Sequence, residues 1–542
     1  MQSIPYRHPP NGCCDSIDET QLIPGGMSAL SNLVPAPDTK GQWVPRPASL
    51  KLAGSDTFNP GFVSCQIVVG NVLYGMVSSA LTAGFDEPFA YNLLSGALIT
   101  VTGITGANVP TSPPTTGLWT PPHMEVIGVK IIVTHTGFSG AGTNFFGVFD
   151  ISNPLAPAWS SANTATNALP SVPVWVEQFF QRAYFFCNPA GAQPAVLATD
   201  VLDPLTRTNA TYVLTFGDNI PITCGGGLPL DNQLGGQIQS LIVFKGVSNM
   251  FQITGDFAAT STNGIPFLQM NALNIATGTL APNSVVPTPK GLMFVAPDGL
   301  RLIGFDAHVS DPIGFSGTGI AVPFSSAVIP SRICAACNAT TIRISTQNGS
   351  VAGNPFQEWC YDIVRAVWHG PHTFPASLIS AYGASFISTR VGGIKGLWSS
   401  EISPTATSTY TENGAAMTCT YQTIMLPERQ DMRECSMVES LFYEGHGSGN
   451  FTFNVTAFNQ SGAAGGFASI NVSGSTTLWD SFTWGSSVWL GTQNALSARV
   501  IPWTAPIVFD RMGIQITVTA AAGIRLGDLY MVYQPLGYSA VP

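Results

Sequence analysis

The sequence predicts an all-β protein with a β-propeller-like core, and three observations support this fold class. Sustained helical periodicity, with apolar residues three and four positions apart, is almost absent. Short apolar or alternating runs rich in Val, Ile, Phe and Thr are separated by Gly, Pro, Asn and Asp. The runs recur in clusters that begin roughly 40 to 60 residues apart. We therefore expect about six to eight irregular blades, an extended N-terminal arm and a C-terminal antiparallel β-sheet domain.

Residues 1–55 are predicted to form the extended N-terminal arm. This segment is rich in proline and shows no periodicity. Such an arm has little core of its own, so we expect it to lie across a neighbour.

Residues 56–401 are predicted to form the propeller-like domain. Each cluster holds a few short strands, and one cluster alone cannot bury both of its faces. Radial repetition solves this problem and leaves only short sheet edges. Asp298-Gly299 predicts a tight hairpin in the fifth cluster. A string of β-sandwiches is the competing all-β arrangement. The clusters cover residues 68–102, 129–159, 183–200, 240–255, 291–304, 339–368 and 378–399.

Residues 402–542 are predicted to form the C-terminal β-rich domain. A polar stretch at 403–414 marks the junction with the preceding domain. Beyond it, residues 451–455, 468–472 and 514–518 alternate between apolar and polar side chains. This pattern is typical of a half-exposed antiparallel sheet.

The composition favours an assembly component. Only 9% of the residues are charged, whereas an ordinary soluble domain has about 25%. A surface so poor in charge must be covered by hydroxyl and amide groups or be buried against neighbours. The first option would suit a secreted β-rich protein, and the second indicates an obligate assembly.

The charge balance argues against a protein that grips nucleic acid. The net charge is −10, and the 20 Lys and Arg residues are scattered without a basic run. Binding through phosphate neutralisation requires clustered cations. Duplex DNA could still slide past an acidic or neutral wall.

No targeting or membrane-spanning segment is predicted. Residues 1–10 lack the apolar core of a signal peptide. The most apolar stretch, 65–85, contains Gln66, Asn71 and several glycines, so strands are favoured over a membrane helix. The ten cysteines show no framework spacing, and buried thiols are the expected state.

The sequence contains one candidate metal site. Cys334 and Cys337 form a C-x-x-C motif, and His369 and His372 could complete a four-ligand zinc site. However, the histidines are closer together than in zinc fingers, and Gly370-Pro371 rules out a helix between them. We favour ordinary thiols beside a loop, and predict no metal and no cofactor.

No catalytic residues are predicted. The glycine-rich stretches 137–142, 224–227 and 314–319 lack the spacing of a nucleophile elbow or a phosphate loop, so we interpret them as mobile loops. The 30 acidic residues do not single out a pair for glycoside hydrolysis. Five tryptophans could stack on sugars but more often such residues fill cores; they are Trp43, Trp119, Trp159, Trp175 and Trp368.

Residues 241–245 predict an apolar strand that ends in Lys, 253–256 contain Ile-Thr-Gly, and 291–300 predict a strand closed by a Pro-Asp-Gly turn. This order of hairpins resembles the central part of the podovirus tail nozzle family, whose members are also called tail hub, tail tubular or packaged-DNA stabilisation proteins. The resemblance covers about half of the chain, in patches. Further similar patches are 26–35, 46–47, 359–368, 509–514 and 526–529.

The resemblance implies a structural virion protein that is not an enzyme. A ring of copies, six in the family, would form a tube that retains packaged DNA, conducts it during ejection and carries tail fibres or spikes. Its partners would be further copies, the adaptor ring near the portal and, transiently, the DNA. Its location would be the phage tail, assembled in the host cytoplasm. The alternative is a propeller glycosidase or lyase, or a sugar-binding protein, acting on host surface polysaccharide.

Overall fold

Strands dominate the structure, a computed structural model. Its regular elements are β-strands and two short 3₁₀-helices, η3 (Pro282–Ser284) and η5 (Pro330–Arg332), in the described part of the chain. It describes residues 4–8, 12–13, 26–37, 41–55, 63–78, 84–112, 120–230, 238–257, 268–273, 276–313, 329–347, 356–373, 376–390, 396–402, 410–412, 415–424, 434–447, 451–458, 464–472, 494–500, 507–509, 512–520 and 524–538.

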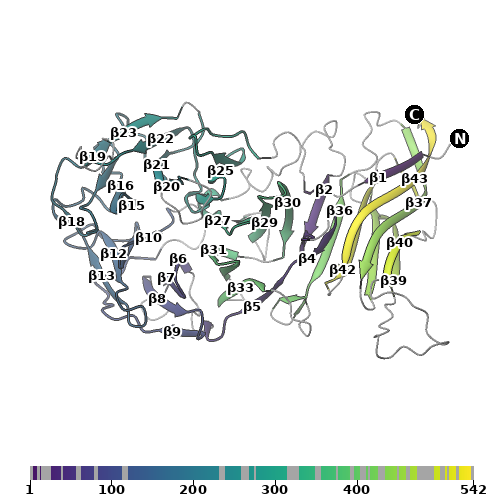
Figure 1. The fold of residues 1–542 in the computed structure, drawn as a ribbon, viewed down its shortest axis with the longest axis horizontal. Helices are drawn as coiled ribbons and strands as arrows, with labels where there is room; N and C mark the ends of the chain where they lie inside the picture. The colour runs from purple at the N-terminus through teal and green to yellow at the C-terminus, as the bar shows by residue number, and fades with distance from the viewer. Residues whose placement is uncertain are drawn as a thin grey trace.

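Seven antiparallel sheets follow one another along the described part of residues 63–402 and are arranged around a ring (Figure 1). Blade one holds β6 (Val63–Val69), β7 (Val72–Ser78), β8 (Asp86–Asn92) and β9 (Ala97–Ile99). Blade two holds β10 (His123–Ile127), β11 (Lys130–Thr134), β12 (Phe146–Asp150) and β13 (Ala158–Ala162). Blade three holds β15 (Pro173–Phe179), β16 (Arg182–Cys187), β17 (Ala195–Ala198) and β19 (Val213–Thr215). A small parallel pair, β14 (Ala165–Thr166) and β18 (Thr206–Arg207), lies beside them. Blade four holds β20 (Cys224–Pro229), β21 (Ile238–Lys245), β22 (Asn249–Thr254) and β23 (Gln269–Ala272), and blade five holds β24 (Val286–Thr288), β25 (Gly291–Ala296) and β26 (Gly299–Ile303). Blade six holds β27 (Cys334–Cys337), β28 (Thr341–Gln347), β29 (Phe356–Asp362) and β30 (Val367–His372). Blade seven holds β31 (Ala376–Tyr382), β32 (Ser385–Arg390) and β33 (Gly396–Ile402).

The ring is closed in two ways. The first strand of each blade contacts the first strand of the next, and β31 of blade seven contacts β6 of blade one. In addition, β5 (Ala48–Lys51) pairs with β33, with Leu50 opposite Ser399. Blade seven thus joins chain segments from before and after the ring, which resists opening. The predicted propeller-like core of six to eight blades is confirmed.

Two further sheets form the C-terminal part (Figure 1). Tyr421 donates a hydrogen bond from its hydroxyl to the Gly527 carbonyl across the two sheets, at 3.1 Å. Buried Ile514 and Ile516 share one core with Leu526 and Leu529. The first sheet has the order β2 (Met27–Ser31), β36 (Thr418–Thr423), β42 (Gly513–Thr519), β38 (Phe451–Phe458), β39 (Ala464–Val472). The second has the order β3 (Leu33–Pro35), β4 (Trp43–Pro45), β43 (Arg525–Tyr538), β37 (Glu434–Gly447), β40 (Asn494–Val500), with β1 (Ile4–His8) beside β43 and β41 (Ile507–Phe509) beside β37.

The N-terminal segment lies across both parts of the molecule. Its strands β1 to β4 belong to the C-terminal sheets, whereas β5 completes blade seven together with β34 (Thr411–Glu412) and β35 (Ala415–Ala416). Strand β2 also packs against β30, the outermost strand of blade six. The proline-rich segment therefore packs against other parts of the same chain.

Residues 224–227 are not a mobile loop, so that interpretation is wrong. They form most of β20, the innermost strand of blade four. A Cβ atom on Gly225 would overlap the ring of Phe186, and one on Gly227 would overlap Ile238. The glycines are needed because neighbouring side chains come too close for any larger residue.

Other expectations have mixed outcomes. The Asp298-Gly299 hairpin is confirmed by β25 and β26, which pair Ala296 with Gly299. The apolar stretch 65–85 contributes β6 and β7, as predicted. Residues 314–319 and Trp119 lie outside the described residues. No helix among the described residues is long and apolar enough to cross a membrane.

Candidate functional site

The structure does not bring together the four residues considered as candidate zinc ligands. Cys334 and Cys337 lie on β27, the innermost strand of blade six, whereas His369 and His372 lie on β30, the outermost. The two thiols also point to opposite faces, because residues three apart on a strand do so. Cys334 bonds to the Ser377 carbonyl at 3.3 Å, and Cys337 to the Asn338 carbonyl at 2.8 Å.

A different cysteine accompanies the two histidines. The Cys360 sulfur and the facing nitrogens of His369 and His372 all lie within 4.8 Å of one another. A bulge makes this arrangement, because Glu358 pairs with His372 and Cys360 with His369, so that β30 has one extra residue. The extra residue places both imidazoles on the same side of the strand.

Hydrogen bonds fix the protonation of this histidine pair. The backbone N–H of Asn32 donates to Nδ1 of His372 at 2.9 Å. A neutral His372 must then carry its proton on Nε2, which donates to Nδ1 of His369 at 3.0 Å. Burial lowers the pKa of His369 to about 3 and that of His372 far below its ordinary value, so both rings are neutral near pH 7.

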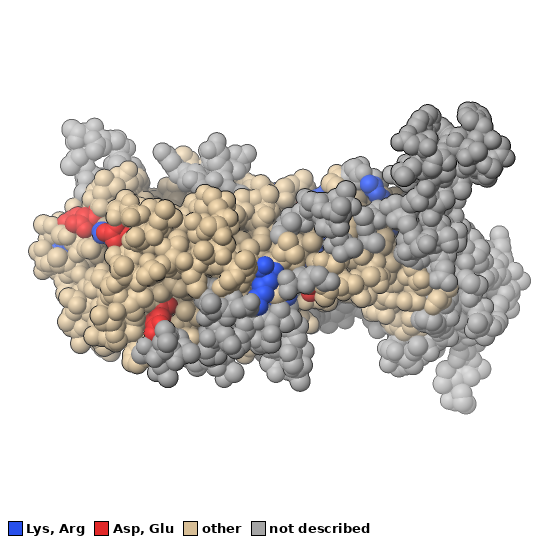
Figure 2. Space-filling view, turned by 90° about the horizontal axis from the view of Figure 1, so that it is seen from below, with Lys and Arg blue, Asp and Glu red and all other residues tan. Residues whose placement is uncertain are grey.

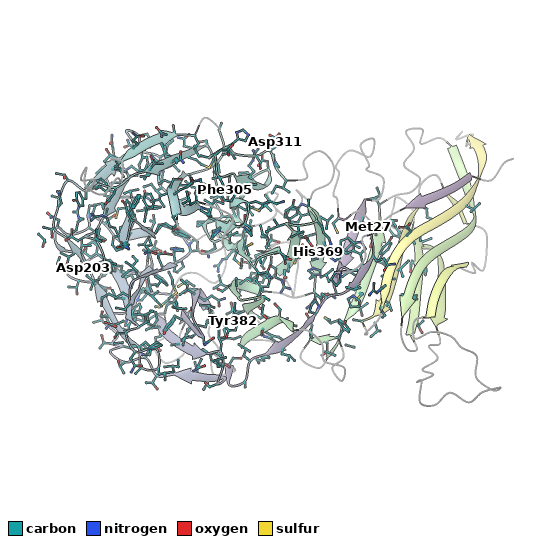
Figure 3. All side chains as sticks on the ribbon, viewed as in Figure 1. Met27, Asp203, Phe305, Asp311, His369 and Tyr382 are labelled. Atoms are coloured by element: carbon teal, nitrogen blue, oxygen red, sulfur yellow. The ribbon has the colours of Figure 1, made fainter. Side chains whose placement is uncertain are left out.

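These residues do not fit a metal ion. A histidine that binds metal through Nε2 normally donates its Nδ1 proton to a carbonyl or a carboxylate. Nδ1 of His372 instead faces an N–H donor, so metal binding at Nε2 would set two donors against each other. The pair instead connects the N-terminal segment to blade six through the hydrogen bond from Asn32. His369 lies on the side of the propeller that faces Met27 of β2 (Figure 3).

A cavity of about 960 Å³ lies beside this pair. Its walls come from the N-terminal segment, blades six and seven and the C-terminal part. Most of its arginines have carboxylate partners: Arg46 pairs with Glu412 and Arg343 with Glu358, while Arg365 lies 2.9 Å from Asp362. The pair of Arg46 and Glu412 joins segments 366 residues apart in the sequence, so we interpret the cavity as the centre of a junction. Its charged lining residues are Arg46, Arg343, Arg365, Arg525 and Asp362.

A second cluster lies on the innermost strands of blades two and three. His123 stacks on Trp175 with ring centres 3.6 Å apart, and Trp175 donates from Nε1 to Glu177 at 2.8 Å. His123 Nε2 lies 3.9 Å from Glu177 Oε1. Burial raises the pKa of Glu177 to about 7, and burial together with Glu177 raises the pKa of Glu125 well above its ordinary value. No motif in the sequence predicts this cluster. Its only local signal is the two-residue spacing that puts His123 with Glu125, and Trp175 with Glu177, on shared strand faces.

The tryptophans weighed as sugar platforms are core residues where the structure describes them. Trp43, Trp159, Trp175 and Trp368 are all buried. Buried rings cannot present a face to a carbohydrate. The eight cysteines whose side chains are described are also buried and form no disulfide with one another.

Exposed apolar side chains concentrate on one face of the propeller. Strands in a blade are antiparallel, so the connections from first to second and from third to fourth strand leave the ring on the same face, which we call the turn face. Among described residues, every large hydrophobic side chain that is more than half exposed, from 52% to 73%, lies in such a connection. They are Leu94, Val129, Leu155, Leu202, Leu230 and Val364.

Comparisons with known proteins give only distant likenesses. No family model and no curated protein matches the chain. The β-propeller domain of Cps50 (Swd1) from Myceliophteria thermophila is 11% identical, with 63% of this chain and 97% of that chain covered and a TM-score of 0.36. The β-propeller domain of the Trilobed protease from Pyrococcus furiosus is 8% identical (63% and 95% covered, TM-score 0.33). An exo-β-1,3-galactanase from Phanerochaete chrysosporium is 10% identical (90% and 99% covered, TM-score 0.25). Likenesses this weak assign no function, and the propeller assignment rests on the strand pairing above.

Proposed function

We propose that this protein is a structural subunit of a virus particle, a nozzle or tube component of a short-tailed phage tail. Copies of the chain form a ring, hexameric in the family it resembles, that retains packaged DNA and conducts it during ejection. The resemblance of residues 241–256 and 291–300 to tail nozzle proteins supports this proposal, as does the combination of a propeller with two further sheets.

The turn face is the observation that carries the proposal. Strand connections normally carry polar residues, and a small soluble domain keeps apolar patches off its surface. Leu94, Leu155 and Leu202 instead project from three successive blades on one face. This arrangement suits burial against a neighbouring copy, where apolar side chains form the centre of the contact.

The scarcity of charge supports the same role. Figure 2 shows one side of the molecule, where Lys, Arg, Asp and Glu form a few small groups and other residues cover most of the described surface. A wall of this kind, with a net charge of −10 for the chain, would not hold phosphate groups, so DNA could slide along it.

The mass and symmetry of the assembly test the proposal. Purified protein and tails from virions should show a ring with a central channel in negative-stain images, and light scattering should give the mass of several copies. A stable monomer that is absent from tail density would refute the proposal.

Matched variants test the turn face. Replacing Leu94, Leu155 and Leu202 together by Ser should dissociate the ring, because each substitution removes apolar area from the contact. Replacing Ile220, Val247 and Leu280 by Ser is the control, because these exposed residues lie in connections on the opposite face. Equal effects of the two triple variants would exclude the turn face as the contact.

The second candidate function, a propeller glycosidase or sugar-binding protein, is favoured by the carboxylate pair Glu125 and Glu177. Most glycoside hydrolases use two nearby carboxyl groups for catalysis. Degradation of host polysaccharide by the wild type, lost in Glu177→Gln and in Glu125→Gln, would establish the enzyme. Saturable binding without turnover would establish the sugar-binding protein.

A further inference from the structure

The cavity beside His369, between the propeller and the C-terminal sheets, concentrates the positive charge of the chain (Figure 3). Its charged lining residues are Arg46, Arg343, Arg365, Arg525 and Asp362. Four of the 20 Lys and Arg residues therefore line one cavity, against one of the 30 Asp and Glu residues. In a chain with a net charge of −10, such a group of arginines indicates a place where negative charge is bound.

The two buried arginines of the cavity are held in fixed positions by the protein. Arg46 pairs with Glu412, and its Nε donates to the side-chain oxygen of Asn32 at 2.9 Å. Arg343 pairs with Glu358. Guanidinium groups fixed in this way contribute a positive potential that needs no reorganisation when an anion enters.

The two histidines that line the cavity respond to this potential. Burial is the largest cause that lowers the pKa of His372, and the neighbouring His369 is the next. Arg46 and Arg343 lower it further. At His369, the carboxylate of Asp362 acts in the opposite direction. The end of the cavity at His372 therefore disfavours a further positive charge, which is the property of an anion site.

Arg365 offers a hydrogen-bond donor to a ligand. Its Nη1 donates to Asp362 Oδ2 at 2.9 Å, and its Nη2 donates to the Ala36 carbonyl, also at 2.9 Å. Its Nε donates no hydrogen bond to the described part of the chain, and 38% of the side chain is exposed. Arg365 is thus anchored at one end and retains a charged donor for an anion.

Much of the remaining lining is apolar, which indicates more than a bare inorganic ion. Five of the apolar lining residues come from the N-terminal segment: Val34, Pro35, Val44, Pro45 and Pro47. Phe386 and Ile524 add further apolar surface. The volume of about 960 Å³ lies within the range of about 300 to 1,000 Å³ that small-molecule sites occupy.

We infer that this cavity binds a small organic anion, in which a carboxylate or phosphate group is joined to an apolar body. The charged group lies at the arginines, with Arg365 and Arg525 in direct contact, and the apolar body lies against the proline-rich lining. Such a ligand touches the N-terminal segment, blades six and seven and the C-terminal part, so it stabilises their junction. The inference rests on the fold and does not depend on the proposed role in a virus particle.

Isothermal titration of the full-length protein at constant ionic strength tests the site. Phenyl phosphate and benzoate are the probes, because each joins one of the two anionic groups to an apolar ring. At least one should bind with one equivalent, and the tighter of the two identifies the preferred anionic group. Inorganic phosphate should bind at least about tenfold more weakly than phenyl phosphate, because it buries no apolar area.

Variants of the two less buried arginines test the contacts. Arg365→Gln and Arg525→Gln should each weaken binding of the tighter probe by at least about tenfold, since each removes a charge-assisted hydrogen bond. Arg365→Lys should bind with intermediate affinity, because it keeps the charge and loses the planar fork.

Arg301→Gln is the matched control. Arg301 on blade five pairs with Asp298 three residues away, just as Arg365 pairs with Asp362, but it does not line the cavity. This variant should keep the affinity of the wild type. Circular dichroism of each variant verifies that it folds.

Three results would overturn the inference. The first is a folded wild type that binds neither phenyl phosphate nor benzoate. The second is unchanged affinity in folded Arg365→Gln and Arg525→Gln. The third is an equal loss of affinity in Arg365→Gln and Arg301→Gln, which would assign the binding to general attraction by cations.

Discussion

The cluster at His369 and His372 and the cluster at His123 both bury imidazole rings. The rings differ in the hydrogen bond that the ring nitrogen facing the backbone makes. His372 accepts a hydrogen bond from the Asn32 N–H, whereas His123 donates to the Val176 backbone. In His372 the lone pair on Nδ1 accepts a hydrogen bond from the backbone. In His123 the lone pair on Nε2 accepts no hydrogen bond from the described part of the chain. In the first cluster three candidate ligand atoms lie within 4.8 Å of one another, yet its hydrogen bonds oppose a metal ion. Close spacing of the ligand atoms is therefore not sufficient for a metal site.

Acid should have the largest effect, and it acts on the first cluster. Burial holds the pKa of His369 at about 3 and that of His372 well below its usual range, whereas histidine in an unfolded chain titrates near pH 6.5. The unfolded state therefore binds more protons, and stability falls as the pH decreases from about 6.5 towards 3. By about pH 4, His369 alone should cost about 3 kcal/mol.

Urea unfolding between about pH 7 and about pH 4 measures this loss. The comparison is with the double variant His369→Gln/His372→Asn, which retains His123, whose pKa burial also lowers to about 3. The double variant should lose clearly less stability on acidification. An equal loss in both proteins would mean that the pair is not its source.

Alkaline conditions should have the next largest effect, and they act on the second cluster. The pKa of Glu177 is about 7, above the value of about 4.3 in an unfolded chain, so the folded state binds more protons between these values. Stability should therefore fall as the pH rises through this window. Glu177→Gln should therefore be more stable than the wild type by up to about 3 kcal/mol at pH 8, and no more stable at pH 4.

The smallest effect is expected from Cys360→Ala. The buried thiol lies near the histidine pair and donates to Glu358 Oε1 at 3.6 Å, so its removal should cost about 1 kcal/mol through lost packing and the loss of this weak hydrogen bond. The acid sensitivity of the protein should be unchanged, because the hydrogen bonds of His369 and His372 do not involve the thiol. A large change in that sensitivity would give Cys360 a role that the geometry does not indicate.

Much of the fold could be predicted because it follows from local patterns. The seven predicted clusters correspond in order to the seven blades, since short alternating runs and turn residues are read along a few neighbouring positions. The misinterpretation of residues 224–227 has the opposite origin. Glycines favour loops locally, but here they make room for Phe186 and Ile238, which come from other strands.

The sequence by itself determined the all-β class, the order of the blades and the scarcity of surface charge, because these depend on composition and short-range periodicity. Only the tertiary structure decided which side chains meet. Cys334 and Cys337 share a motif but point apart on a strand, a bulge aligns His369 with His372, and strand packing between two blades places His123 beside Glu177. Contacts of this kind depend on strand register and on packing between segments far apart in sequence, which a local pattern does not encode.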